Sequence, residues 1–275
     1  MGKEQQKQEI REYCKLLGLR HMAGNFEAAL SGPGDSLDYL HALLSGEIEE
    51  KSQRSIDSRI RSARFPYRKY LSGLDEECLP DGLRSRLPEL KTLEFIPRGQ
   101  NVILTGNPGT GKTHTAIGLG LAACESGYRV LFTTVPHLVT ELMESKDRKK
   151  LRSYERSFEK YDLVIADELG YVSFDRAGAD LLFANLSLRS MEKSTIITSN
   201  LTFSRWDEVF GDAALTSAIV DRLTYRAILI NMEGDSYRLR ETMRENGGDF
   251  DLVRERGTAA SAGPARIPGG TVGHG

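Results

Sequence analysis

Eight residues at positions 106–113 have the types and spacing of a phosphate-binding loop. They read GNPGTGKT and match the pattern G-x-x-x-x-G-K-[ST]. An apolar run at 101–105 precedes them, and a run with helical spacing at 113–125 follows. This is the strand, loop and helix context that the pattern requires. A chance match in a glycine-containing loop is the alternative, and the flanking elements argue against it.

The glycines would let the backbone N–H groups of this loop curl around a phosphate at the positive end of the following helix. Lys112 would then reach the β- and γ-phosphates of ATP, and the Thr113 hydroxyl would ligate Mg²⁺. We therefore predict ATP and Mg²⁺ as cofactors. The residues expected to contact the nucleotide are Gly106, Asn107, Pro108, Gly109, Thr110, Gly111, Lys112, Thr113 and His114.

Two acids, Asp167 and Glu168, directly follow the short apolar run 163–166. By itself this pattern fits any buried strand that ends in a solvated acid pair. Behind a phosphate loop it indicates a nucleotide hydrolase, in which Asp167 holds the Mg²⁺ shell and Glu168 takes a proton from the attacking water. The guanine-reading pattern N-K-x-D is absent from the sequence, which argues against a small GTPase.

The next expected strand ends in a polar residue, Asn200. Neighbouring parallel strands end at one rim of a sheet, so Asn200 would lie beside Asp167 and could orient water against the γ-phosphate. A turn-forming asparagine is the alternative.

Strands alternate with helices through the segment that carries these motifs. Such alternation predicts an α/β fold, a three-layer, doubly wound parallel sheet. The expected strands are 102–105, 129–134, 163–166, 195–198 and 227–230, and the expected helices are 113–124, 136–144, 151–160, 174–189 and 213–223.

Apolar residues recur at intervals of three and four from 9 to about 63, which predicts a small all-helical N-terminal domain. Its last helix, 52–63, is expected to be separate and basic, because 51–69 holds seven basic residues and one acid, a net charge of +6. A solvated charged face is one interpretation, and binding to DNA phosphates is the other. We expect Arg54, Arg61 and Arg64 to share one helix face. The candidate DNA contacts are Arg54, Arg61, Arg64, Arg68 and Lys69.

Composition restricts the remaining possibilities. The formal net charge of the 275 residues is −2, so any nucleic-acid site must be a local patch. Three widely separated cysteines suit a reducing bacterial cytoplasm, and no apolar run is long enough to predict a membrane span. We predict four parts: a helical domain at 1–66, a connector at 67–98, the ATPase domain at 99–246 and a disordered glycine-rich tail at 247–275.

Taken together, these motifs resemble those of AAA+ ATPases. More narrowly, the chain resembles the IstB-like transposition helper proteins of insertion sequences, which are relatives of the DnaC-type helicase loaders. The resemblance covers about residues 10–245. It is carried by RSARFP (61–66), NVILTGNPGTGKTHTAIGLGLAACESGYRVLFTT (101–134), DLVIADELGY (162–171), STIITSNLTFSRW (194–206), AIVDRLTYRAILI (218–230) and GDSYRLR (234–240).

The resemblance gives these residues family roles. Lys112 and Thr113 belong to Walker A, Asp167 and Glu168 to Walker B, and Asn200 is sensor 1. Arg222 corresponds to the arginine finger that such proteins insert into the ATP site of the next subunit, with a helix-surface Asp–Arg pair as the alternative. The short segment after 223 leaves no room for the usual four-helix lid. The only nearby candidates for sensor 2 are Arg238 and Arg240, and we assign neither.

The function implied is that of an ATP-hydrolysing, DNA-binding homo-oligomer, a ring or spiral on duplex DNA with ATP sites shared between subunits. It would assist a partner transposase in insertion-sequence transposition. Two alternatives stay open, a DnaC-like replicative helicase loader and an ATP-dependent DNA scaffold that does not hydrolyse ATP. The basic segment 51–69 favours the transposition role over the loader.

Overall fold

The computed structural model describes residues 2–30, 35–189, 192–234 and 236–237. The sensor 2 candidates Arg238 and Arg240 and the glycine-rich tail at 247–275 therefore lie outside the described residues. Within the described ranges, no helix combines the length and apolar character needed to cross a membrane.

A parallel sheet of five strands forms the centre of the molecule, in the order β2-β3-β4-β1-β5. This confirms the expected α/β fold. The central strands are almost wholly buried because helices cover both faces. The strands are β1 (Val102–Thr105), β2 (Val130–Thr134), β3 (Leu163–Leu169), β4 (Ser194–Ser199) and β5 (Ile228–Asn231).

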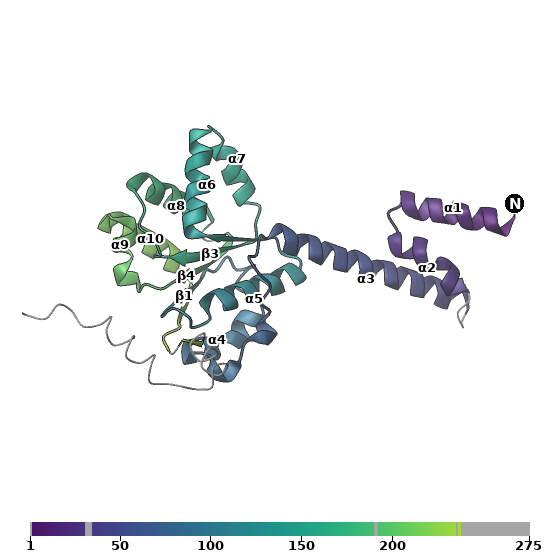
Figure 1. The fold of residues 1–275 in the computed structure, drawn as a ribbon, viewed down its shortest axis with the longest axis horizontal. Helices are drawn as coiled ribbons and strands as arrows, with labels where there is room; N and C mark the ends of the chain where they lie inside the picture. The colour runs from purple at the N-terminus through teal and green to yellow at the C-terminus, as the bar shows by residue number, and fades with distance from the viewer. Residues whose placement is uncertain (1, 31–34, 190–191, 235, 238–275) are drawn as a thin grey trace, which may run out of the picture.

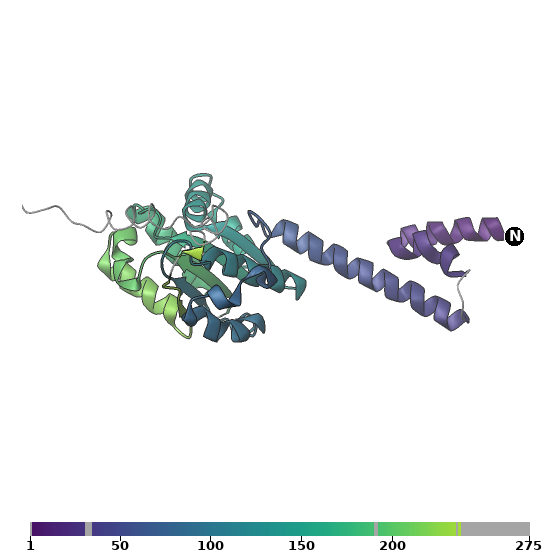
Figure 2. The same cartoon turned by 60° about the horizontal axis from the view of Figure 1, so that its bottom comes forward.

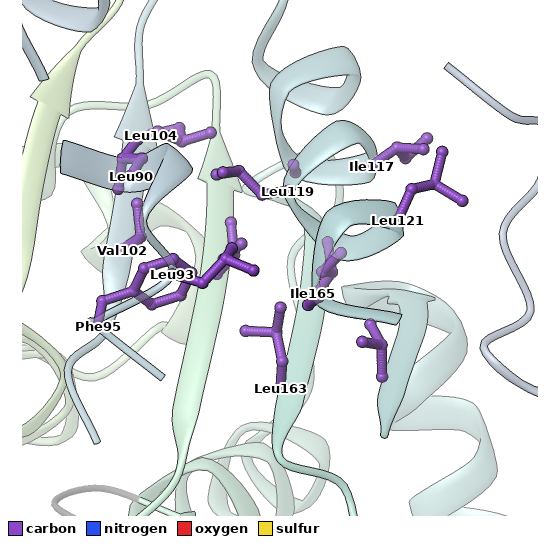
Figure 3. Packing of buried hydrophobic residues seen from close by; sticks show 14 of the residues in the cluster. Leu90, Leu93, Phe95, Val102, Leu104, Ile117, Leu119, Leu121, Leu163 and Ile165 are labelled. Carbon is purple, nitrogen blue, oxygen red and sulfur yellow. The ribbon is translucent and has the colours of Figure 1, made fainter. Parts of the chain in front are cut away.

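Alternate side chains of β1 to β4 enter two separate cores, as the pleat of a strand requires. Val102 and Leu104 pack with helices α4 (Asp81–Lys91) and α5 (Lys112–Glu125), and this core is seen in Figure 3. Ile103, between them, belongs to the core of the other face. The helices that contribute to that second core are α6 (Val135–Asp147), α7 (Leu151–Phe158), α8 (Arg176–Arg189), α9 (Asp207–Phe210) and α10 (Ala213–Thr224).

Helix α4 lies in the stretch that the sequence suggested was a connector without a strong period. Leu83, Leu87 and Leu90 of this helix are buried in the same core as β1. The sequence did not predict this helix because proline usually interrupts helices, and here Pro80 is the N-cap and Pro88 lies inside the helix. The other short elements that were not predicted are α9 and the 3-10 turns η1 (Leu71–Gly73), η2 (Glu76–Cys78) and η3 (Phe203–Arg205).

The N-terminal region is helical, as expected, but its last helix is not separate. Helix α3 (Ser36–Ser62) is continuous over 27 residues, and it begins at a capping box formed by Asp35 and Asp38. It projects from the body and carries α1 (Lys3–Leu16) and α2 (Arg20–Leu30) toward its far end (Figures 1 and 2). The separate helix expected at 52–63 is wrong because no proline interrupts the chain between 36 and 62.

Candidate nucleotide-binding site

The loop between β1 and α5 has the backbone that its glycines predict. Gly106, Gly109 and Gly111 all have positive φ, at 144°, 83° and 93°. A Cβ on Gly106 would lie 2.4 Å from the carbonyl oxygen of Met232, so a side chain has neither the conformation nor the space it needs there. The loop opens onto the N-terminus of α5, where backbone N–H groups favour an anion.

Lys112 is nearly buried beside this loop, with 7% of its surface exposed. Its ammonium donates hydrogen bonds to the carbonyl oxygens of Gly106 and Asn107, both at 2.7 Å. Thr110 supports the loop from within, since its hydroxyl donates to the same Asn107 oxygen at 2.9 Å. The cation is therefore held against the concave loop in which a phosphate would sit.

Asp167 connects the end of β3 to the loop. Its carboxylate accepts hydrogen bonds from the Thr113 hydroxyl at 3.0 Å and from the Thr198 hydroxyl of β4 at 2.5 Å, and only 3% of the residue is exposed. Hydroxyl and carboxylate oxygens are ligands that Mg²⁺ prefers, so Thr113 and Asp167 fit the predicted ion. The described residues hold no cluster of three or more His, Cys, Asp or Glu that would bind a metal without a nucleotide.

Glu168 lies on the open side of the same group. Its φ is 65°, and its backbone N–H donates to the Thr198 hydroxyl at 2.9 Å. The hydroxyl of Thr198 thus bonds both to the Asp167 carboxylate and to the Glu168 backbone. Glu168 is exposed, and it lines a cleft of about 310 Å³ together with Asn200 and the loop residues. The sequence-predicted residues on this lining are Pro108, Gly109, Gly111, Lys112, Thr113, His114, Glu168 and Asn200.

A family model described as IstB-like ATP binding protein matches residues 13–245. The chain belongs to this family. The match extends over the helical N-terminal region as well as the α/β body, so the IstB-like resemblance inferred from the motifs is confirmed.

Named relatives come from bacterial insertion sequences. A Geobacillus stearothermophilus protein named as an insertion sequence IS5376 ATP-binding protein is 39% identical over 239 residues, which is 86% of this chain and 95% of the relative. A Pseudomonas aeruginosa protein named as an insertion sequence IS21 ATP-binding protein is 38% identical, over 85% of this chain and 89% of the relative.

Solved structures share the fold of this IstB-like chain. Aquifex aeolicus DnaA bound to AMPPCP superposes with a TM-score of 0.51 and 23% identity over 70% of this chain and 59% of that one. DnaI superposes with a TM-score of 0.52 and 22% identity over 60% of this chain and 91% of that one. The three-layer α/β fold expected from the sequence is thereby confirmed.

Arg222 lies outside the cleft of its own IstB-like chain. It is exposed near the end of α10, and it is not among the described residues that line the cleft. Gly106 and Asn107 line an adjoining hollow of about 270 Å³, and Asn200 lines both this hollow and the cleft.

The basic residues of 51–69 do not form the single arginine face that the sequence suggested. Arg54 is held by Glu47 at 3.1 Å, and Arg64 is paired with Glu141 of α6 at 3.0 Å. Arg64 has a φ of 63° beyond the end of α3, so it does not continue the helical face. Arg61 and Arg68 are exposed, whereas Lys69 lines the nucleotide cleft.

Several residues of the site carried no clear sequence signal. Thr198 reads as one more strand residue, and its contact with Asp167 depends on the register between β3 and β4. Three tyrosines join Lys69 on the cleft lining, and none of them was predicted from the sequence to have a role in the site. They are Tyr67, Tyr171 and Tyr237.

Proposed function

We propose that this protein is an ATPase that assembles on duplex DNA as a homo-oligomer and assists a partner transposase in the bacterial cytoplasm. The observation that carries the proposal is the convergence of Lys112, the Thr113–Asp167 pair and the exposed Glu168 on one cleft. The insertion-sequence names of the relatives support the biological setting.

The cleft supports hydrolysis of the terminal phosphate of ATP. Lys112 would bind the β- and γ-phosphates, and Thr113 and Asp167 would hold Mg²⁺, which neutralises phosphate charge when bound. Glu168 is adjacent to these groups, and its carboxylate would accept a proton from water as the water attacks the γ-phosphate. Asn200 would orient that water from the end of β4. Phosphate release measured with and without duplex DNA tests this proposal against a scaffold that does not hydrolyse ATP.

Thr198→Val is expected to slow ATP hydrolysis by about 10- to 100-fold, because a hydrogen-bond partner behind a metal ligand typically has an effect of this size. The change removes the donor to Asp167 and the acceptor for the Glu168 N–H while keeping the side-chain volume. Steady-state phosphate release measures the rate, and Thr198→Ser is the control that retains the hydroxyl. A parental rate in Thr198→Val would show that this hydroxyl does not position the two acids.

Two exposed basic regions support DNA binding. One is the part of 51–69 that is not paired with carboxylates, and Arg61 and Arg68 are its exposed arginines. The other is the region of the α6–α7 turn, where Lys149 and Lys150 of the turn and Arg152 of the first turn of α7 are exposed. Exposed Lys and Arg side chains bind DNA by neutralising phosphates and releasing counterions, without reading the sequence. The overall charge of −2 leaves such patches as the only basis for the interaction.

Changing Lys149, Lys150 and Arg152 together to Ala is expected to weaken duplex binding uniformly across sequences. The slope of log affinity against log salt should flatten by about 0.9 per lost contact, up to roughly 2.7. The matched control changes Arg86, Lys91 and Arg98, which lose the same charge but are paired with Glu89, Glu76 and Glu94. If both triple variants shift the slope equally, the turn is not a DNA contact. We expect a smaller change from Arg54, Arg61 and Arg64, since two of these already pair with carboxylates.

The identity of the protein partner distinguishes a role in transposition from a role in helicase loading. We infer a transposase because the named relatives belong to insertion sequences. The likeness to DnaI concerns the fold alone, so it does not favour a helicase. A pull-down from purified components, with the transposase of the same insertion sequence and the host replicative helicase as competing baits, decides between them. Retention of the helicase alone would replace the proposed role by helicase loading.

A further inference from the structure

A strap of residues 63–73 leads from the end of α3 across α5 to η1. At its start, the Ala63 carbonyl accepts a hydrogen bond from the Phe132 N–H of β2 at 2.8 Å. The centroid of the Phe65 ring lies 6.2 Å from that of the Phe132 ring. A Cβ built on Gly120 would be only 2.8 Å from the Phe65 ring. The first half of the strap is therefore fixed in the core beside α5.

The strap is fixed again at its other end. Leu71 packs on Gly118 of α5 so closely that a Cβ there would lie 2.7 Å from its side chain and 3.1 Å from its backbone nitrogen. One residue earlier, the Tyr70 carbonyl oxygen is 3.1 Å from Nε2 of His114. Between these two sets of contacts, residues 67–69 are exposed. They directly precede Tyr70, whose carbonyl oxygen contacts His114.

Tyr67 and Lys69 line the nucleotide cleft together with Lys112 and Thr113. The Lys69 ammonium lies 5.9 Å from the centre of the Tyr67 ring, which is within the range of a cation–π contact. The pKa of His114 is lowered, mainly by burial. The hydrogen bond to the Tyr70 backbone raises this pKa, whereas the positive charge of Lys69 lowers it. Among the described residues, no carboxylate forms an ion pair with Lys69.

We propose that Lys69 binds the polyphosphate of ATP from outside the phosphate loop, and that the Tyr67 ring positions its ammonium. This inference rests on the proposed ATP binding. The polyphosphate carries several negative charges, and Lys112 is the cation that the loop itself provides. A second ammonium on the same lining, attached to a flexible stem, would contact the outer side of the phosphates.

This assignment moves Lys69 from the DNA-binding set to the nucleotide site. Its chain neighbour Arg68 is also exposed, but it does not line the cleft in the described structure. The two residues carry the same charge at adjacent positions, so they form a matched pair for an experiment.

The experiment titrates the full-length protein with a fluorescent ATP analogue in the absence of DNA, following anisotropy. Lys69→Met is expected to bind the analogue about tenfold more weakly, the usual effect of losing a hydrogen bond to a charged group. Arg68→Met should stay within about twofold of the parent, and Lys69→Arg should restore most of the affinity. Thermal melting of each variant checks that the fold is retained.

The outcomes separate this inference from the proposal on which it rests. If the parent protein does not bind the analogue, the proposed ATP binding fails. If the parent binds it and Lys69→Met binds equally well, the role of Lys69 is wrong. Equal analogue binding combined with weaker duplex binding by Lys69→Met would return the residue to the DNA-binding set.

Discussion

Glu168→Gln should bind ATP as tightly as the parent and hydrolyse it about 10²- to 10⁴-fold more slowly, the range for loss of a general base. The amide keeps the size of the side chain but cannot accept the proton of the attacking water. The backbone contact of Glu168 to Thr198 involves its N–H, so the substitution leaves it intact. Phosphate release and binding of a fluorescent ATP analogue measure the two properties separately.

Two comparisons make this result interpretable. Lys112→Ala should lose tight ATP binding itself, because it removes the cation held against the phosphate loop. Glu125→Gln is the matched control, since Glu125 is exposed at the opposite end of α5 from the cleft. Equal hydrolysis rates for Glu168→Gln and the parent would exclude Glu168 as the base.

The parts of the site that follow from local sequence were predictable. The phosphate loop lies within one strand, loop and helix, and its glycines fix its backbone wherever that unit occurs. The proximity of Thr113 and Asp167 could also be predicted from the sequence, because the carboxyl ends of parallel strands share one edge of a sheet. Asn200 reaches the same cleft for that reason.

Contacts that depend on register or on the path of irregular chain were not predictable. Thr198 contacts Asp167 because Ala166 pairs with Ile197, and one residue of slip would direct its hydroxyl to the opposite face. Lys69 reaches the cleft only because two glycines of α5 let the strap approach closely.

In the basic segment 51–69, the sequence likewise could not predict which charges form ion pairs. Counting charges along 51–69 is correct, but it does not show which charges are already neutralised. Glu141, the partner of Arg64, is 77 residues away in the chain and comes close only through the packing of α6. Long-range ion pairs of this kind decide which part of a basic run can meet DNA phosphates.

Arg222 is the residue that separates an oligomeric ATPase from one that works as a single subunit. Its own cleft contains Lys112 but not Arg222, which is exposed near the end of α10. Charge develops on the γ-phosphate oxygens during transfer, and an arginine from a neighbouring subunit accelerates the reaction by on the order of 10³ or more. Arg222→Ala is therefore expected to bind ATP as an isolated subunit and to lose both hydrolysis and ATP-dependent assembly.

Mixing two inactive variants tests whether Arg222 acts in the neighbouring site. A Lys112→Ala subunit cannot bind ATP tightly, but it retains Arg222 and can place it against the intact cleft of an Arg222→Ala subunit. Recovery of phosphate release on mixing is the expected result, because each pair then contains one complete site. Arg176→Ala is the control, since Arg176 is exposed on α8 and pairs with Asp212 at 3.6 Å, so its loss should leave hydrolysis unchanged. If Arg222→Ala alone keeps the parental turnover and assembly, Arg222 is a surface residue of α10 and the finger must come from another arginine.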